Sequence, residues 1–196
     1  MFWLIFSIAL WGVIHSLMAS LGFKNLLQRM VGSGFMRFYR LFFNVFSVLS
    51  FAPILYLLIT LPDRDMYQVP VPLNYFMLAG QGLSVLMLFV AVLQTDTLAF
   101  IGLRQLLTDE MNENLVTSGL YRFVRHPLYT FGLLILWLSP SMTINSLVVY
   151  MSLTIYILVG AYFEERKLMR VFGQEYAEYK SITPMLIPDL RFWRNK

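Results

Sequence analysis

Cysteine is absent from this chain of 196 residues, and histidine occurs only twice, at His15 and His126. Without cysteine the chain can form no disulfide framework, no thiolate zinc site and no catalytic thiol. Two histidines are too few for a histidine-built metal centre, so we expect no bound metal.

Charged residues are also scarce. They make up 13% of the chain, whereas hydrophobic residues make up 58% and the mean hydropathy is +0.65. An average soluble domain has roughly 25% charged residues. This balance excludes a soluble globular domain, a disordered chain and a nucleic-acid-binding module, and it indicates a polytopic membrane protein. The net charge of +4 requires no nucleic acid, because membrane proteins gather Lys and Arg in cytoplasmic loops.

Long apolar runs predict the membrane helices. The uncharged stretches 2–21, 41–61 and 71–95 can each cross a bilayer core, which takes about 20 helical residues. The run 128–138 is too short to cross alone, and Ser139-Pro140-Ser141 separates it from the run 142–163. We expect these two to form a helical hairpin that turns at Pro140. The predicted fold is an all-α integral membrane protein with five transmembrane helices, the fourth short or tilted.

The basic residues predict the orientation. Fourteen of the fifteen Lys and Arg residues fall in 22–40, in 96–127 or after residue 163, and Arg64 is the exception. The positive-inside rule makes that side cytoplasmic, with the N-terminus outside and the C-terminus in the cytosol. Residues 1–20 lack a basic start, so we interpret them as a retained anchor and not as a cleaved signal peptide.

Two cytoplasmic segments, 96–127 and 164–188, mix both signs of charge with glycine and apolar residues. Long connections are usually functional or disordered, and these contain too many apolar and aromatic residues for disorder. We therefore expect the two segments to close together over a site at the membrane surface.

The first segment ends in Arg125-His126-Pro127. Pro127 disfavours helical geometry at His126 and suits the first turn of the following helix. That helix start would offer N–H groups and a positive dipole end to an anion, beside Arg125 and His126. An interfacial anchor is the structural alternative.

The second segment begins with Glu164 and Glu165, directly after an apolar run. Acidic residues at that depth are costly and usually have partners, although a solvated helix end is the simpler interpretation. We expect the helix to continue to Gly173, a good C-terminal stop. One glutamate can then face the bundle while the other faces water.

These motifs together resemble a known family. Arg125-His126-Pro127-Leu128-Tyr129, the glutamate pair and the segment 172–179 are similar to the isoprenylcysteine carboxyl methyltransferase superfamily, integral membrane enzymes that use S-adenosylmethionine. The resemblance covers 115–188. It implies a cytosolic cofactor pocket, lined at matching positions by Val116, Tyr121, His126, Pro127, Leu128, Tyr129 and Glu164.

Shorter motifs look like one branch, the methanethiol S-methyltransferases, which methylate a small thiol to a volatile sulfide. They lie at 15–20, 39–44, 102–105 and 183–188, and the third adds Gln105 to the predicted cofactor residues. The isoprenylcysteine enzymes have an arginine one helical turn before the glutamate, where this chain has Gly160, which disfavours a prenylcysteine carboxylate. The resemblance implies one domain over 1–196, with three spans in 1–95 and the cofactor-binding segments and hairpin in 96–196. It also implies a bacterial inner membrane.

Methyl transfer from a sulfonium requires an aligned nucleophile in a dry site, and a thiol must lose its proton to react well. The proton can pass to water, to His126 or to a glutamate of the pair, and the catalytic candidates are Arg125, His126 and Glu165. The expected cofactor is S-adenosylmethionine, with S-adenosylhomocysteine as product. A lipid-like acceptor, either a prenylcysteine or a phospholipid amine, and a non-enzymatic protein that retains the fold are the alternatives. His15, inside the first span, is open to a functional or a packing interpretation.

Overall fold

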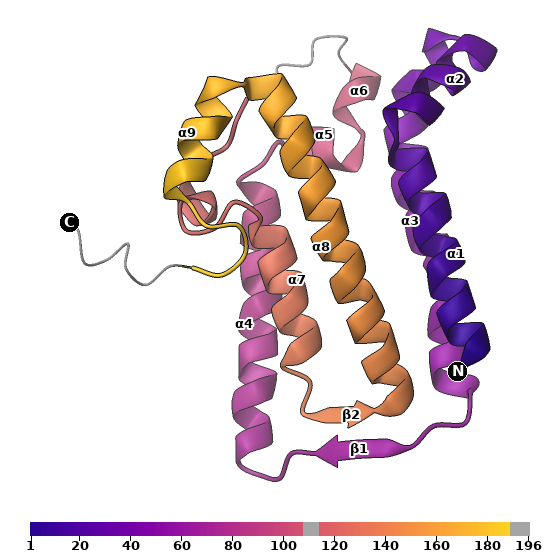
Figure 1. Ribbon diagram of the computed structural model, residues 1–196, viewed down its shortest axis with the longest axis vertical. Helices are drawn as coiled ribbons and strands as arrows, with labels where there is room; N and C mark the ends of the chain where they lie inside the picture. Colours follow the sequence, from indigo (N-terminus) through magenta and orange to yellow (C-terminus); the bar gives the residue numbers. More distant parts are fainter. Residues whose placement is uncertain (108–113, 189–196) are drawn as a thin grey trace. The chain divides into compact units, whose positions relative to one another are not determined.

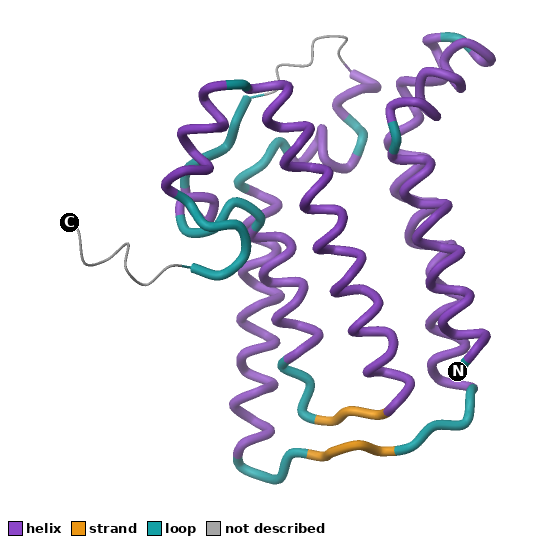
Figure 2. The backbone as a smooth tube through the Cα atoms, in the orientation of Figure 1, coloured by secondary structure: helices purple, strands orange, loops and turns teal. Residues whose placement is uncertain are grey.

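The computed structural model describes residues 1–107 and 114–188, which are mostly helical (Figures 1 and 2). The chain divides into two compact units, which are described separately. The first comprises Met1–Met66, Asp96–Asn112 and Met142–Ser152, and the second comprises Tyr67–Thr95, Glu113–Ser141 and Leu153–Lys196. A two-stranded sheet pairs β1 (Asp65–Gln68) with β2 (Ser141–Thr143).

The first unit is built on the helix pair α1 (Phe2–Ala19) and α3 (Ser33–Thr60), joined by α2 (Leu21–Val31). The Tyr39 hydroxyl donates to the carbonyl of Met18 at 2.6 Å, and the Trp11 indole donates to the Ser50 hydroxyl at 3.1 Å. In an apolar helix pair such polar groups need partners within the protein, so these bonds fix how α1 lies along α3.

The short helices α5 (Thr97–Ile101) and α6 (Arg104–Leu107) also belong to this unit. The Asn44 amide on α3 donates to the carbonyls of Phe100 and Ile101 at 3.0 and 2.8 Å, and so satisfies the end of α5. Gly102 has φ +98°, and a Cβ there would lie 2.5 Å from the backbone nitrogen of Leu41. Only glycine allows this close approach.

The second unit packs α4 (Leu73–Leu93) against α7 (Pro127–Trp137), which lie side by side in Figure 1. The Gln81 amide donates to the carbonyl of Ile135 at 2.6 Å, and a Cβ at Gly80 would approach the Leu138 side chain to 2.9 Å. Small residues let helices approach closely, which accounts for glycine at this contact.

Helix α8 (Ile144–Phe172) runs from the first unit into the second, where α9 (Gln174–Ile182) follows it. As predicted, α8 continues past both glutamates and ends before Gly173, whose φ of +54° reverses the chain. A side-chain hydrogen bond links α7 to α8 within the second unit, because the Trp137 indole donates to the Thr154 hydroxyl at 3.0 Å.

Four helices are long and apolar enough to cross a membrane: Phe2–Ala19, Gly34–Thr60, Leu73–Leu93 and Ile144–Phe172. Only 6–17% of their apolar windows is buried in the protein, as expected for helices that face lipid. Helix α7 has 11 residues and spans about 16 Å, too short to cross alone. The integral membrane assignment is thus supported, whereas the fifth span stays a prediction. Two helices extend beyond the apolar runs that predicted them: α3 begins before residue 41, and α8 ends after residue 163.

Candidate functional site

The segment before α7 is fixed by a glycine and a glutamine. Gly119 begins the 3₁₀ turn η1 (Gly119–Arg122) with φ +62°, and a Cβ there would lie 2.5 Å from the Gln94 side chain. Gln94, at the end of α4, accepts a hydrogen bond from the backbone N–H of Leu120 at 2.8 Å. The end of α4 therefore sets the path of the chain toward Arg125.

Helix α7 begins at Pro127 as predicted, and His126 has the non-helical angles φ −124° and ψ 66°. The backbone N–H of Arg125 donates to the carbonyl of Pro184 at 2.9 Å, and that of His126 donates to Met185 at 3.1 Å. These two N–H groups, which precede the helix, therefore bind the chain that follows α9. That the first N–H groups of α7 itself bind an anion stays a prediction.

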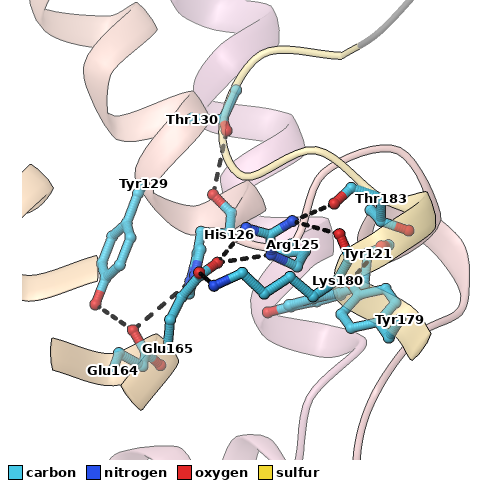
Figure 3. A network of polar contacts seen from close by, with 10 residues as sticks. All are labelled: Tyr121, Arg125, His126, Tyr129, Thr130, Glu164, Glu165, Tyr179, Lys180 and Thr183. Carbon is cyan, nitrogen blue, oxygen red and sulfur yellow. Dashed lines mark hydrogen bonds and ion pairs between the residues drawn. The ribbon is translucent and has the colours of Figure 1, made fainter. Parts of the chain in front are cut away.

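Glu165 is the centre of a buried ion-pair network (Figure 3). Its side chain is 8% exposed, and its Oε1 atom lies 2.6 Å from Nε and 2.5 Å from Nη2 of Arg125. Its Oε2 atom lies 2.8 Å from Nζ of Lys180. The third guanidinium nitrogen, Nη1, donates to the carbonyls of Lys180, at 3.3 Å, and Thr183. All three nitrogens of Arg125 are thus used within the protein.

Glu164 has different surroundings. Its side chain is 43% exposed, and its Oε2 atom accepts a hydrogen bond from the Tyr129 hydroxyl at 2.7 Å (Figure 3). The Nδ1 atom of His126 lies 3.7 Å from the same oxygen. Among the residues that the structure describes, no Lys or Arg pairs with Glu164. Glu164 is therefore the partly exposed carboxylate of the pair, and no fixed cation neutralises it in the described structure.

His126 lies between the two carboxylates. Its side chain is 6% exposed, its Nε2 atom is 3.4 Å from Oε1 of Glu165, and its ring stacks on Tyr129 with centroids 5.3 Å apart. Burial lowers the pKa of the imidazole; the two glutamates oppose this effect without reversing it, and Arg125 adds to it. The imidazole is therefore neutral at neutral pH.

Tyrosines close the far side of the network. The Tyr179 hydroxyl donates to the carbonyl of Tyr121 at 2.6 Å, which ties α9 to the segment before α7. Tyr176 is fully buried, and burial together with the nearby Glu165 carboxylate raises its pKa to about 12. Burial and the charge of Glu164 raise the pKa of Tyr121 to about 12. These phenols stay protonated at neutral pH.

The structure thus brings together the predicted residues Tyr121, Arg125, His126, Tyr129, Glu164 and Glu165. Pro127 is buried beside them at the start of α7, while Val116 and Leu128 are half-buried in the same unit. Gln105 belongs to the first unit, where its amide donates to the carbonyl of Ala99 at 3.2 Å. It is not part of the network that forms within the second unit.

Sequence reasoning missed Lys180 and Thr183 as members of the network. The signal was the glycine turn at Gly173, because a short helix that reverses after α8 must return toward the residues that α8 presents. Within residues 1–107 and 114–188, no three His, Asp or Glu side chains gather as a metal site would require.

Several relatives carry the name methanethiol S-methyltransferase, including the following three. The protein from Pseudomonas deceptionensis is 44% identical over 75 residues, which cover 38% of this chain and 29% of that protein. Enzyme 1 of Bradyrhizobium diazoefficiens is 46% identical over 78 residues, or 40% and 26% of the two chains, and enzyme 2 is 38% identical over 110 residues, or 54% and 42%. The matched regions therefore span less than half of these relatives. No solved structure matches the chain.

The predicted resemblance to membrane methyltransferases is confirmed by a family match. The phospholipid methyltransferase family matches residues 75–175, which is just over half of the chain and includes most of α4 and all of α7 and α8. This region contains the segment from Gln94 to Tyr129 and both glutamates. The protein belongs to the phospholipid methyltransferase family of membrane methyltransferases.

Proposed function

We propose that the protein transfers a methyl group from S-adenosylmethionine to a small thiol such as methanethiol, forming a methyl sulfide. The observation that carries the proposal is that Glu164 and Glu165 differ in burial and in their cationic partners. Two cations neutralise the buried Glu165, whereas Glu164 is partly exposed and, among the described residues, contacts a phenol and a neutral imidazole. A site of this kind favours a cationic ligand.

Electrostatics supports a sulfonium at this position. A unit positive charge about 4 Å from a carboxylate is attracted by roughly 4 kcal/mol at an effective dielectric constant near 20. Because Glu164 is 43% exposed, solvent screening reduces the gain to the order of 1–2 kcal/mol. The ring faces of Tyr129 and Tyr121 can add a cation–π contribution of about 0.5–1 kcal/mol. Together these terms are enough to select a cation over a neutral ligand.

When bound, S-adenosylmethionine supplies a methyl group on a positively charged sulfur. Glu164 and Tyr129 would hold the charged end of the donor, and the buried tyrosines would exclude water around it. His126 is neutral and can accept the thiol proton, with water or Glu164 as the other acceptors. Arg125 and Glu165 bind each other, so we assign them a positioning role instead of contact with the reacting atoms.

The small-thiol acceptor rests on the names of the relatives and on Gly160. This residue lies one helical turn before Glu164, and a Cβ there would meet no atom within 4 Å. Gly160 itself offers no cation to an acceptor carboxylate. A phospholipid amine is the second candidate, which the name of the matching family favours.

The finer membrane arrangement belongs to the same proposal. We assign five spans, with α7 crossing only part of the bilayer as one arm of a helical hairpin with α8. The distribution of basic residues supports an N-terminus outside and a site at the cytosolic face. The bacterial inner membrane is proposed from the family resemblance. A single domain over 1–196 would then combine three spans in 1–95 with the cofactor-binding segments in 96–196.

The direct test supplies purified protein with methyl-labelled S-adenosylmethionine and methanethiol, and measures labelled dimethyl sulfide. A parallel reaction contains phosphatidylethanolamine vesicles in place of the thiol. Labelled sulfide formed by the wild type and lost in Glu164→Gln supports the proposal. Labelled lipid without labelled sulfide replaces the thiol by the phospholipid. No label in either product, together with no binding of S-adenosylmethionine, excludes both enzymatic interpretations.

A further inference from the structure

The chain after α9 lies along the start of α7, and each of its residues from 183 to 186 accepts a hydrogen bond from residue 125, 126 or 130. We call residues 183–186 the C-terminal strap. The backbone N–H groups of Arg125 and His126 donate to the strap carbonyls of Pro184 and Met185. Two consecutive backbone bonds hold the strap against the start of α7, and they leave these two carbonyls satisfied without water.

Side chains fasten the same segment. The Thr130 hydroxyl, one turn into α7, donates to the carbonyl of Leu186 at 2.8 Å, and Arg125 donates to the carbonyl of Thr183. Figure 3 shows Thr130, Arg125 and Thr183 around the strap, with Lys180 reaching from α9 to Glu165. Backbone and side-chain hydrogen bonds therefore hold the strap beside Arg125 and His126.

The two oxygens of Glu165 have separate partners. Arg125 contacts Oε1, and Lys180 contacts Oε2. Lys180 is the cation that contacts Oε2, whereas Arg125 and His126 contact Oε1. Loss of Lys180 would thus remove one of the two cations from a buried carboxylate, which is costly and favours a rearrangement of the side chain.

A rearrangement of Glu165 would change the electrostatic environment of the His126 imidazole, which lies 3.4 Å from it. Charged and titratable groups face this imidazole from every element packed against it: Arg125 on its own segment, Tyr129 on α7, Glu164 and Glu165 on α8, and Lys180 and Tyr176 on α9 behind Glu165. Lys180 itself does not contact the imidazole, so its removal changes the charge around His126 through Glu165.

We propose that Lys180 is a positioning residue of the methyl-transfer site, which holds Glu165 against Arg125 and so leaves Glu164 as the single carboxylate presented to a cationic donor. This inference rests on the proposed function for its ligand, but its structural part does not. Lys180 never touches the donor in this arrangement. It acts through Glu165, Arg125 and His126, and its side chain is 45% exposed, so we expect a moderate effect on affinity and not an abolition of binding.

The chain allows a direct measurement of this effect. Because it contains only two histidines, selective isotope labelling of histidine gives two imidazole signals in nuclear magnetic resonance, and His126→Gln assigns them. In Lys180→Met the Glu165 carboxylate has lost one of its two cations. Its field then favours the charged form of His126, so the titration midpoint of this imidazole moves to a higher pH than in the wild type.

Donor binding supplies the second measurement. Calorimetry with S-adenosylmethionine on the full-length protein is expected to show roughly tenfold weaker affinity in Lys180→Met. Lys180→Arg, which keeps the charge, is expected to restore both the affinity and the imidazole midpoint. Lys180→Gln keeps a hydrogen-bond donor without the charge and should shift the midpoint as Lys180→Met does, which covers the case in which Lys180→Met does not fold.

Two controls separate positioning from general loosening. Thr130→Val removes the hydroxyl's bonds to the carbonyls of Leu186 and His126 but no charge, so the titration midpoint of the imidazole should stay at its wild-type value. Thr154→Val removes the bond to Trp137 outside the network and should leave both measurements unchanged. An unchanged midpoint and affinity in both Lys180→Met and Lys180→Gln would overturn the inference. A shifted midpoint in a protein that never binds S-adenosylmethionine would instead retain the network and reject the proposed function.

Discussion

Glu164 and Glu165 follow one another on α8, and their carboxylates have opposite surroundings. Glu165 is buried between the guanidinium of Arg125 and the ammonium of Lys180, whereas Glu164 has the Tyr129 hydroxyl and no cation among the described residues. Consecutive residues on a helix point about 100° apart, so a single helix can supply one structural and one ligand-directed carboxylate. The unequal neutralisation of this pair underlies the predictions about charge.

Replacement of Glu164 by Gln is expected to weaken S-adenosylmethionine more than S-adenosylhomocysteine. The first ligand carries a positive sulfur and the second does not, while Gln keeps the shape of the side chain. We expect about tenfold loss for the cation, on the order of 1–2 kcal/mol, and little loss for the neutral product.

Calorimetry of both ligands on the wild type and on Glu164→Gln measures this difference. Glu175→Gln is a suitable control, because Glu175 is exposed on α9 and has no contact with Glu164 or Tyr129 in the described structure. An equal loss of affinity for both ligands would show that Glu164 contributes shape or hydrogen bonding and no charge recognition.

The buried imidazole of His126 makes folding sensitive to acid. Burial lowers its pKa below the ordinary value of about 6.5. Above that value the imidazole is neutral in both the folded and the unfolded chain. Between the lowered pKa of His126 in the folded protein and about 6.5, the unfolded chain binds a proton that the folded protein does not bind. The free energy of unfolding therefore falls as the pH falls.

Thermal unfolding in detergent at pH 7.5 and pH 5.5 checks the sign of this effect. The wild type should lose more thermal stability on acidification than His126→Gln does, because Gln does not titrate. The prediction fails if the two proteins lose the same stability between these pH values. Methyl transfer, where His126 accepts the thiol proton, should decline over the same acidic range.

Gly119 is expected to tolerate no side chain. Its φ of +62° is costly for other residues, and a Cβ would overlap the Gln94 side chain that accepts from Leu120. Gly119→Ala should therefore destabilise the protein by about 1–3 kcal/mol and reduce donor affinity, since this turn sets the path to Arg125. Gly82→Ala is the control, because a Cβ at that helical position meets no atom within 4 Å. Thermal unfolding and calorimetry would then separate the two variants, and equal stability would contradict the prediction.

Much of this architecture could be predicted from local patterns. Apolar length predicts the four long helices, and Pro127 and Gly173 predict where α7 begins and α8 ends, because a missing N–H and a positive φ act on the chain at that residue. The alternation of a buried Glu165 with an exposed Glu164 also follows from helical geometry.

The remainder depends on contacts between distant residues, for which the sequence carries no local signal. Lys180 resembles any solvated lysine until α9 folds back on α8. Nothing local shows that the N–H groups of Arg125 and His126 will bind the carbonyls of Pro184 and Met185. Gln94 likewise has no pattern that links it to Gly119, 25 positions later.

Gly160 is expected to set the size of the acceptor. A Cβ at this position meets no atom within 4 Å, so Gly160→Ala should fold as well as the wild type, and the better helix propensity of Ala can raise its stability by about 0.5–1 kcal/mol. Filling the space one turn before Glu164 should hinder longer acceptors more than short ones. The ratio of kcat/KM for methanethiol to that for 1-butanethiol should therefore rise in Gly160→Ala and rise further in Gly160→Val. Gly132→Ala, on α7, also fills open space but lies three residues after Tyr129, and serves as the matched control. A ratio that is the same in the wild type and both Gly160 variants would place the acceptor away from this part of α8, even with donor binding intact.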